Sequence, residues 1–173
     1  MPDADPYPRE PWLRGVLPEF DPVVGHLIRA VAHIREDLRR ALDPLRSEDI
    51  WAKPHGMTSA GFHAKHLAGS TRRLCAYLEG RGLTEEEVAA IETESIGSEG
   101  ADELIRLVDI ALENYERQLS ALSPENFGVV RFVGRARFPV TAIGLAIHIA
   151  EHGQRHVGQA ICAAKLARAV RNG

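Results

Sequence analysis

The segment "HIAEHGQRHVGQ", residues 148–159, places His148, His152 and His156 at intervals of four and contains no proline. In an α-helix, residues four apart lie about 6 Å apart along the axis and roughly 40° apart around it. The imidazoles of His152 and His156 can therefore reach the same ion from one helix. Because neutral imidazole is a common ligand for divalent metals, this spacing predicts one half of a metal site.

A second pair of histidines occurs in "FHAKHL", residues 62–67, where His63 and His66 lie about one turn apart among apolar neighbours. Buried neutral imidazoles need hydrogen-bond partners, and one shared cation satisfies several of them at once. We interpret His66, His152 and His156 as the ligands of a mononuclear site. Three nitrogen ligands leave a fourth position open for water, which is the arrangement of catalytic rather than structural zinc.

Other polar residues near this site have two interpretations each. His63 is either a general base or substrate contact beside the metal, or a packed histidine. His148 either supports a neighbouring ligand or lies on the surface. Gln159 shares a helical face with His156, so it either orients a ligand or bound water or is exposed to solvent. His33, in the middle of the first predicted helix, is a further candidate to face the pocket around the metal.

Four long amphipathic patterns would hold these residues in place. Apolar residues recur at intervals of three and four residues, and this period predicts helices over residues 21–42, 59–78, 104–119 and 140–169. A capping box formed by Thr84 and Glu87 predicts a further helix start. Branched and aromatic residues at 129–139 predict a short extended loop or hairpin. With no repeat and no second composition regime, these patterns favour an all-α fold, a four-helix bundle spanning residues 21–173 as one domain.

The chain begins with a proline-rich stretch, because six of its ten prolines fall in the first 22 residues. Proline disfavours a helix interior, so residues 1–20 are expected to form an extended arm. Trp12, Leu13, Val16, Leu17 and Phe20 give this arm apolar side chains to bury. We expect it to lie against the bundle or a partner subunit.

Composition and missing motifs exclude several classes of function. The net charge is -3 and the basic residues are scattered among acidic ones, which argues against nucleic acid as a partner. No apolar run approaches the roughly 20 residues of a membrane span, so we expect a cytoplasmic protein. Cys75 and Cys162 form no metal or disulfide pattern and are expected to be small buried hydrophobes. HExxH, GxGxxG, GxxxxGK[ST] and GxSxG motifs are absent.

Three segments together carry a family resemblance: "EPWLRG" at 10–15, "GFHAKHLAGS" at 61–70 and the closing "HIAEHGQRHVGQ". With them the chain resembles the DinB/YfiT-like superfamily of bacterial four-helix-bundle proteins. The resemblance implies an up-down-down-up helix order and frequent homodimers. It also implies that His66, His152 and His156 ligate a divalent metal, with zinc expected and nickel or iron as alternatives.

The resemblance further implies a class of reaction. Better understood relatives are transferases or isomerases that use low-molecular-weight thiols such as mycothiol or bacillithiol, and many others are named metal-dependent hydrolases. We therefore expect an enzyme acting on a small molecule, and we favour thiol-dependent S-transfer over hydrolysis. The alternatives are a non-catalytic, stress-related bundle that binds a metal or ligand, and a helical scaffold without metal.

Overall fold

Apolar residues line one side of each long helix, and these sides form the core of the protein. The computed structural model describes residues 9–43 and 45–172. Its long helices are α1 (Pro22–Leu42), α3 (Ala60–Leu78), α5 (Ala101–Ser120) and α6 (Ala142–Asn172). The described chain is mostly helical, which confirms the expected all-α class apart from one small sheet.

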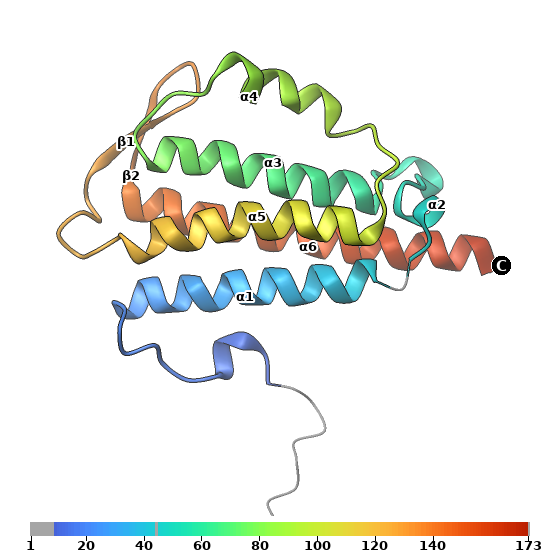
Figure 1. Ribbon diagram of the computed structural model, residues 1–173, viewed down its shortest axis with the longest axis horizontal. Helices are drawn as coiled ribbons and strands as arrows, with labels where there is room; N and C mark the ends of the chain where they lie inside the picture. Colours follow the sequence, from blue (N-terminus) through green and yellow to red (C-terminus); the bar gives the residue numbers. More distant parts are fainter. Residues whose placement is uncertain (1–8, 44, 173) are drawn as a thin grey trace, which may run out of the picture.

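The four long helices pack side by side, and α1 and α3 each lie against both α5 and α6. In Figure 1, α1 and α6 run from left to right, whereas α3 and α5 run in the opposite direction. Every long helix contributes large, fully buried side chains to the core, among them Ile34, Leu67, Tyr115 and Ile149. Because α3 packs against α6, the two histidine-bearing segments come into contact.

Side-chain caps determine where these two helices begin. Ser59 Oγ accepts a hydrogen bond from the backbone N–H of Phe62 at 3.1 Å, which confirms the predicted start of α3. Thr141 Oγ1 accepts one from the N–H of Gly144 at 3.1 Å at the start of α6. A cap of this kind stabilises a helix by about 1 kcal/mol. The Ser59 cap fixes the register that places His66 in the second turn of α3.

A connecting segment leads from α3 to α5, and we call its residues 83–100 the strap. It contains α4 (Glu85–Ala89) and the 3-10 turn η3 (Ala90–Thr93). The predicted capping box is confirmed, because the Thr84 hydroxyl accepts from the Glu87 N–H and the Glu87 carboxylate accepts from the Thr84 N–H. In Figure 1 the strap passes over α3 on the side away from α1.

Residues 129–141 form an antiparallel hairpin, so the prediction of a short extended segment or hairpin is confirmed. Strand β1 (Val130–Val133) pairs with β2 (Phe138–Thr141), with Val133 opposite Phe138. Gly134 has a φ of 73° in the turn, a backbone conformation that glycine adopts without strain. The hairpin precedes α6 directly and leaves Phe138 66% exposed.

The described part of the arm, residues 9–20, lies against α1. It contains one 3-10 turn, η1 (Pro11–Leu13), where no helix was expected, and Arg14 forms an ion pair with Glu36 of α1 at 2.5 Å. Three of its apolar residues are not buried against the bundle, because Trp12, Leu13 and Val16 are 52%, 48% and 88% exposed in the single chain; their burial against a partner subunit stays a prediction. Polar contacts through Arg14 and the partly buried Phe20, which packs against the core, hold the arm to the bundle. Residues 1–8 lie outside the described residues.

Two shorter elements between α1 and α3 were not predicted: α2 (Ser47–Ile50) and the 3-10 turn η2 (Pro54–Gly56). Cys75 is buried as expected, but the same expectation is wrong for Cys162, which is exposed. Its neighbours on α6, Ala160, Ala163 and Ala164, take the core-facing positions.

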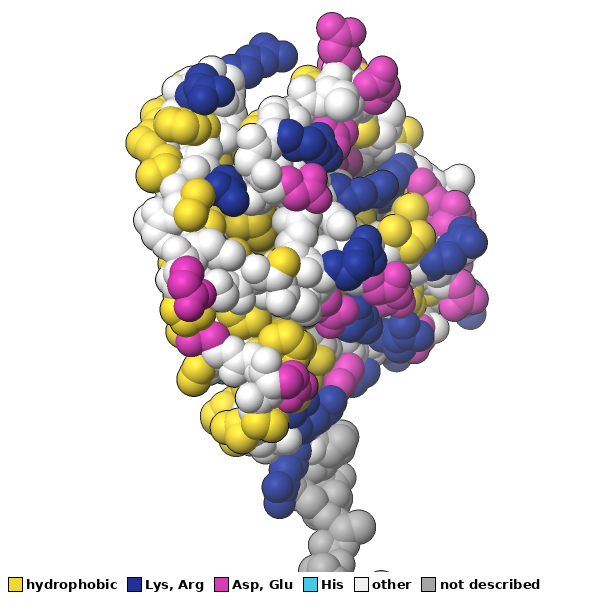
Figure 2. All heavy atoms as spheres, turned by 60° about the vertical axis from the view of Figure 1, so that its left-hand side comes forward, with side chains coloured by type: hydrophobic (Ala, Val, Ile, Leu, Met, Phe, Trp, Pro, Cys, Tyr) yellow, Lys and Arg dark blue, Asp and Glu magenta, His cyan; other side chains and the backbone are white. Residues whose placement is uncertain are grey.

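The surface of the molecule carries mixed charge. The face turned forward in Figure 2 intersperses basic and acidic side chains, while hydrophobic side chains gather along its left and lower edges. No helix among the described residues combines the length and the apolar composition needed to cross a membrane.

Candidate metal centre

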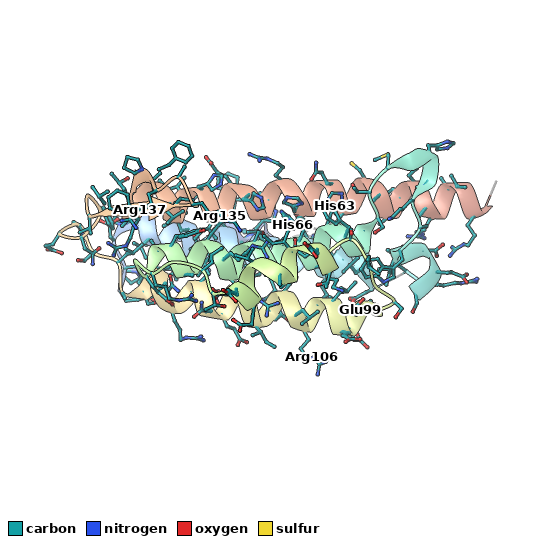
Figure 3. All side chains as sticks on the ribbon, turned by 90° about the horizontal axis from the view of Figure 1, so that it is seen from above. His63, His66, Glu99, Arg106, Arg135 and Arg137 are labelled. Atoms are coloured by element: carbon teal, nitrogen blue, oxygen red, sulfur yellow. The ribbon has the colours of Figure 1, made fainter. Side chains whose placement is uncertain are left out.

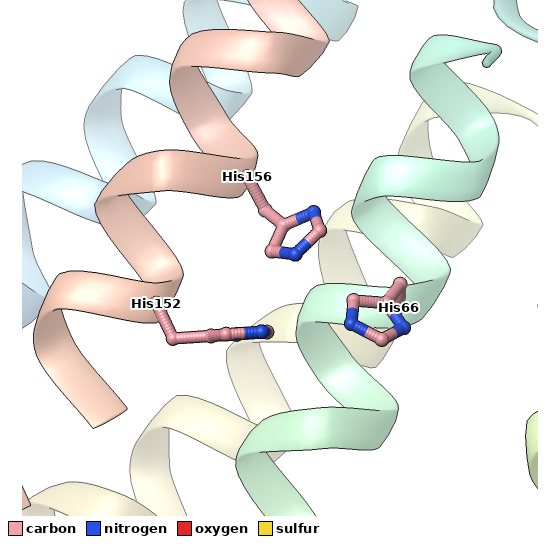
Figure 4. A group of neighbouring side chains, drawn as sticks. All are labelled: His66, His152 and His156. Atoms are coloured by element: carbon pink, nitrogen blue, oxygen red, sulfur yellow. The ribbon is translucent and has the colours of Figure 1, made fainter. Parts of the chain in front are cut away.

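The structure brings His66, His152 and His156 together between two helices. His66 comes from α3, and the other two lie one turn apart on α6 (Figure 4). One ring nitrogen from each histidine lies within 4.8 Å of the others. The centroid of the His156 ring lies 4.5 Å from those of both His66 and His152.

This spacing fits a single divalent ion. Around tetrahedral zinc with Zn–N bonds of about 2.0–2.1 Å, ligand nitrogens stand roughly 3.4 Å apart. An upper limit of 4.8 Å in the protein therefore leaves only small ring rotations to be made on binding. The donor set of three imidazoles suits zinc, nickel or iron better than a hard cation such as magnesium, which prefers oxygen.

A buried carboxylate orients His66. Nδ1 of His66 lies 2.7 Å from Glu94 Oε2, and Arg73 Nη1 donates to Glu94 Oε1 at 2.6 Å. Burial by itself would raise the pKa of Glu94, but the hydrogen bonds from His66 and Arg73 outweigh it, so the pKa is lowered. An ionised Glu94 requires a proton on Nδ1 of His66, which leaves Nε2 with a free lone pair for a metal.

A serine orients His152 in the same sense. The Ser70 hydroxyl donates to the backbone carbonyl of Leu67 at 3.2 Å, and its oxygen lies 3.3 Å from Nδ1 of His152. Since the hydroxyl proton is used by Leu67, the serine oxygen accepts from Nδ1–H of His152. Nε2 of His152 is then the nitrogen left for a metal.

His156 is oriented by another histidine. Nδ1 of His156 lies 3.1 Å from Nδ1 of His63, and Nε2 of His63 lies 2.8 Å from Thr58 Oγ1. A tautomer of His63 with its proton on Nε2 donates to Thr58 and accepts from Nδ1–H of His156. In this arrangement all three metal-facing histidines use Nδ1 for a protein contact and keep Nε2 for the ion.

Burial keeps these imidazoles neutral. The pKa of His152 is lowered to about 4 and that of His156 to about 3, mainly by burial and next by the charge that His66 would carry. The pKa of His63 is lowered for the same two reasons. At pH 7 these rings are therefore unprotonated, as metal binding requires.

The strap delivers Glu94 to this site and is tied down at its far end. Lys65 of α3 donates to the backbone carbonyl of Ile96 at 2.8 Å and forms an ion pair with Glu99 at 2.7 Å. The Trp51 indole N–H donates to the carbonyl of Glu99 at 3.0 Å. Figure 3 shows His63 and His66 between α3 and α6, with Glu99 where the strap leads into α5.

Glu94 was missed by sequence reasoning, because it stands 28 residues after His66 in a segment where the sequence predicted only a helix start. One signal was present. Gly69 and Arg73 follow His66 on the same helical face: Arg73 donates to the Glu94 carboxylate, and at position 69 a Cβ would overlap that carboxylate.

Comparison with known proteins agrees with this geometry. A sequence model of the DinB superfamily matches residues 31–160, about three quarters of the chain. The chain belongs to the DinB superfamily. The match that identifies it runs from the middle of α1 into α6 and includes all three clustered histidines. No curated protein matches the chain.

Two further predicted residues have defined places in this DinB superfamily member. His63 is buried, and both of its ring nitrogens are engaged, by Thr58 and by His156. This placement favours a positioning role over that of a free general base. Gln159 is exposed on α6, while Nδ1 of His156 contacts His63.

The remaining candidates lie at or beyond the edge of the cluster. The His148 side chain is 47% exposed, and its Nδ1 lies 4.0 Å from Glu151. Its ring centroid is 5.9 Å from that of His152, so it borders the site. His33 lies on α1, where its Nε2 is 3.2 Å from Asp37.

Proposed function

We propose that the chain is a metal-dependent enzyme of the DinB superfamily whose reaction takes place at a three-histidine centre. The observation that carries this proposal is that Nδ1 of His66, His152 and His156 each contacts another side chain, while one ring nitrogen of each lies within 4.8 Å of the others. The helix directions in Figure 1 support the up-down-down-up bundle that the resemblance implies. We place the enzyme in the cytoplasm and its substrate among small molecules.

The three histidines would hold one divalent ion, with zinc expected first and nickel or iron as alternatives. Such an ion lowers the pKa of a bound water or thiol and stabilises negative charge that develops beside it. The protein supplies the orientation. Glu94 holds the His66 ring and increases the basicity of its Nε2, and Ser70 and His63 hold the other two rings.

We further propose that the reaction is an S-transfer from a low-molecular-weight thiol to a small electrophile. The family resemblance supports this choice over hydrolysis. The thiol would come from a cosubstrate, because burial raises the pKa of the Cys75 thiol to about 12 and keeps it protonated. Cys162, the other cysteine, is exposed on α6 six residues beyond His156.

The test uses protein loaded with cobalt(II), whose absorption spectrum reports its ligands. Mycothiol and bacillithiol are titrated into the protein, with their S-methyl derivatives as matched controls that cannot form a thiolate. We expect a sulfur-to-cobalt charge-transfer band with the free thiols alone. Metal-loaded protein should then speed the conjugation of the thiol to monochlorobimane, in which a C–S bond forms and chloride and a proton leave.

Three outcomes separate the candidate functions. Conjugation that needs both metal and thiol supports S-transfer. Metal-dependent cleavage of activated esters without added thiol would replace S-transfer by hydrolysis. A protein that binds metal but shows no thiol band and neither activity would be a non-catalytic metal-binding bundle.

A further inference from the structure

A second cavity lies away from the histidines, between the arm and the first turns of α1. Its volume is about 580 Å³, compared with about 380 Å³ for the cavity beside Glu94. Apolar side chains form most of its wall, and two basic residues of α1, His26 and Arg29, complete it. The apolar wall includes Trp12, Leu13, Val16, Leu17 and Phe20. Cavities of this size commonly hold small molecules.

Arg29 supplies the cavity with a cation, and no salt bridge joins it to a carboxylate among the residues that the structure describes. Its Nη2 donates to the backbone carbonyls of Arg14 and Gly15 of the arm, both at 3.2 Å. Its Nε is buried and has no hydrogen-bond partner, and no carboxylate of the described chain pairs with Arg29. By contrast, Arg14 forms an ion pair with Glu36, and Arg35 forms one with Asp109.

The exposed apolar side chains of the arm give the cavity its second property. Val16 is 88% exposed and Trp12 is 52% exposed, although both belong to the wall. Hydrophobic side chains gather at the lower edge of the face in Figure 2, where the arm lies. An apolar groove that ends at a guanidinium with no carboxylate partner among the described residues is complementary to a molecule with an apolar body and one anionic head.

We propose that this cavity binds a small organic monoanion, with its apolar body against the arm and its carboxylate or sulfonate group at Arg29. The site is separate from the metal centre, which lies between α3 and α6 (Figure 1). It therefore goes beyond the proposed enzymatic function. The cavity wall shares no residue with the three-histidine cluster, so the two proposals can fail independently.

Octanoate is the probe, and isothermal titration calorimetry measures its binding to the full-length protein. Octanamide, which has the same chain and no charge, is the matched ligand control. Arg29→Met keeps an unbranched side chain over the first four atoms and removes the guanidinium, and Arg106→Met does the same at an exposed position on α5. We expect saturable 1:1 binding of octanoate that is about tenfold weaker in R29M and unchanged in R106M.

A second pair of variants keeps the test decisive if R29M does not fold. Val16→Glu adds a negative charge at an exposed position of the wall, and Val170→Glu adds one near the end of α6. V16E should weaken octanoate binding and V170E should not. Equal affinity for octanoate and octanamide, or equal binding by wild type and V16E, would overturn the proposal. The proposal would also be overturned if the measured enthalpy changes came from self-association of the protein, because the groove would then bind a second copy of the chain.

Discussion

Glu94 places an ionised carboxylate against Nδ1 of His66, and this contact depends on the absence of a side chain one turn further along α3. A Cβ added at Gly69 would overlap Arg73 Nη1, at 2.9 Å, and Glu94 Oε1, which would lie closer still, so these side chains would have to move. Carboxylates that hydrogen-bond to metal-ligating histidines typically change metal affinity by about 10- to 100-fold when lost. At the scale of single residues, we therefore predict that Gly69 supports the candidate metal centre although it ligates nothing.

Gly69→Ala should displace Glu94 and weaken metal binding by about tenfold or more. The reason is steric, because the new methyl group takes the place of the carboxylate. Competition with a chromophoric chelator measures the affinity. Gly158→Ala on α6 is the matched control, since nothing lies within 4 Å of a Cβ there. Equal metal affinity in G69A, G158A and wild type would show that Glu94 does not support His66.

The buried histidines also predict how the metal-free protein responds to pH. The pKa values of His152 and His156 are lowered from 6.5 to about 4 and about 3 in the folded chain. Between pH 6.5 and these values the unfolded chain binds protons that the folded chain does not. The free energy of unfolding should thus be highest above pH 6.5 and should fall as the pH drops toward 4.

Urea unfolding of metal-free protein at pH 7.5 and pH 5 measures this dependence. The double variant H152A/H156A should lose less stability over that interval than wild type. His148→Ala, at an exposed position, should behave as wild type. Parallel losses in wild type and the double variant would mean that these rings are not buried neutral.

Sequence reasoning reached some of these residues and not others. His152 and His156 are four residues apart in the sequence, and helical geometry predicted from this spacing that their side chains would converge on one point. Ser70 and Glu94 could not be found in that way, because each reaches its histidine across a contact between segments. The sequence left His63 as either a general base or substrate contact, or a packed histidine. Its hydrogen-bond partners, Thr58 and His156, could be identified only from the three-dimensional structure.

At the scale of elements, the strap lies against α3 and positions Glu94 beside His66. Lys65 anchors it through Glu99 and the carbonyl of Ile96, and its ammonium lies 5.6 Å from the Trp51 ring. The capping box of the strap was predictable from local sequence. Its path over α3 was not, since that path depends on these long-range contacts.

Lys65→Met should loosen the strap without removing Glu94. The methionine keeps the length of the side chain but loses the ion pair with Glu99 and the hydrogen bond to Ile96. Faster hydrogen exchange of the backbone amides at 94–100 is expected, with a smaller loss of metal affinity than in G69A. Lys165→Met, at an exposed position on α6, is the control. Unchanged exchange at 94–100 would show that Lys65 does not anchor the strap.

At the scale of the whole molecule, the long helices were largely predictable and their surroundings less so. Apolar periodicity placed the four long helices, because burying one side of each is what holds them together. The arm behaved differently: its apolar residues predicted burial against the bundle or a partner subunit, and the bundle leaves Val16 88% exposed. A periodic pattern constrains which face of a helix is buried, but an irregular segment carries no such constraint.

A homodimer is our prediction for the assembly. Phe132 and Phe138 on the hairpin are 44% and 66% exposed, and a second copy of the chain would remove this apolar surface from water. Light scattering should give twice the chain mass of 19.0 kDa. Phe138→Lys should shift the protein toward monomer, whereas Val170→Lys should not. A wild type that is monomeric at every concentration would contradict the prediction.

The most direct test of the metal centre is elemental analysis of untagged protein. Wild type is compared with the His66→Ala, His152→Ala and His156→Ala variants, and with His33→Ala and His148→Ala as folded controls. We predict one divalent ion per chain in wild type and in both controls, and its loss in each of the three ligand variants. Wild type that stays empty after incubation with zinc, nickel or iron(II), or variants that retain full metal content, would contradict the three-histidine centre.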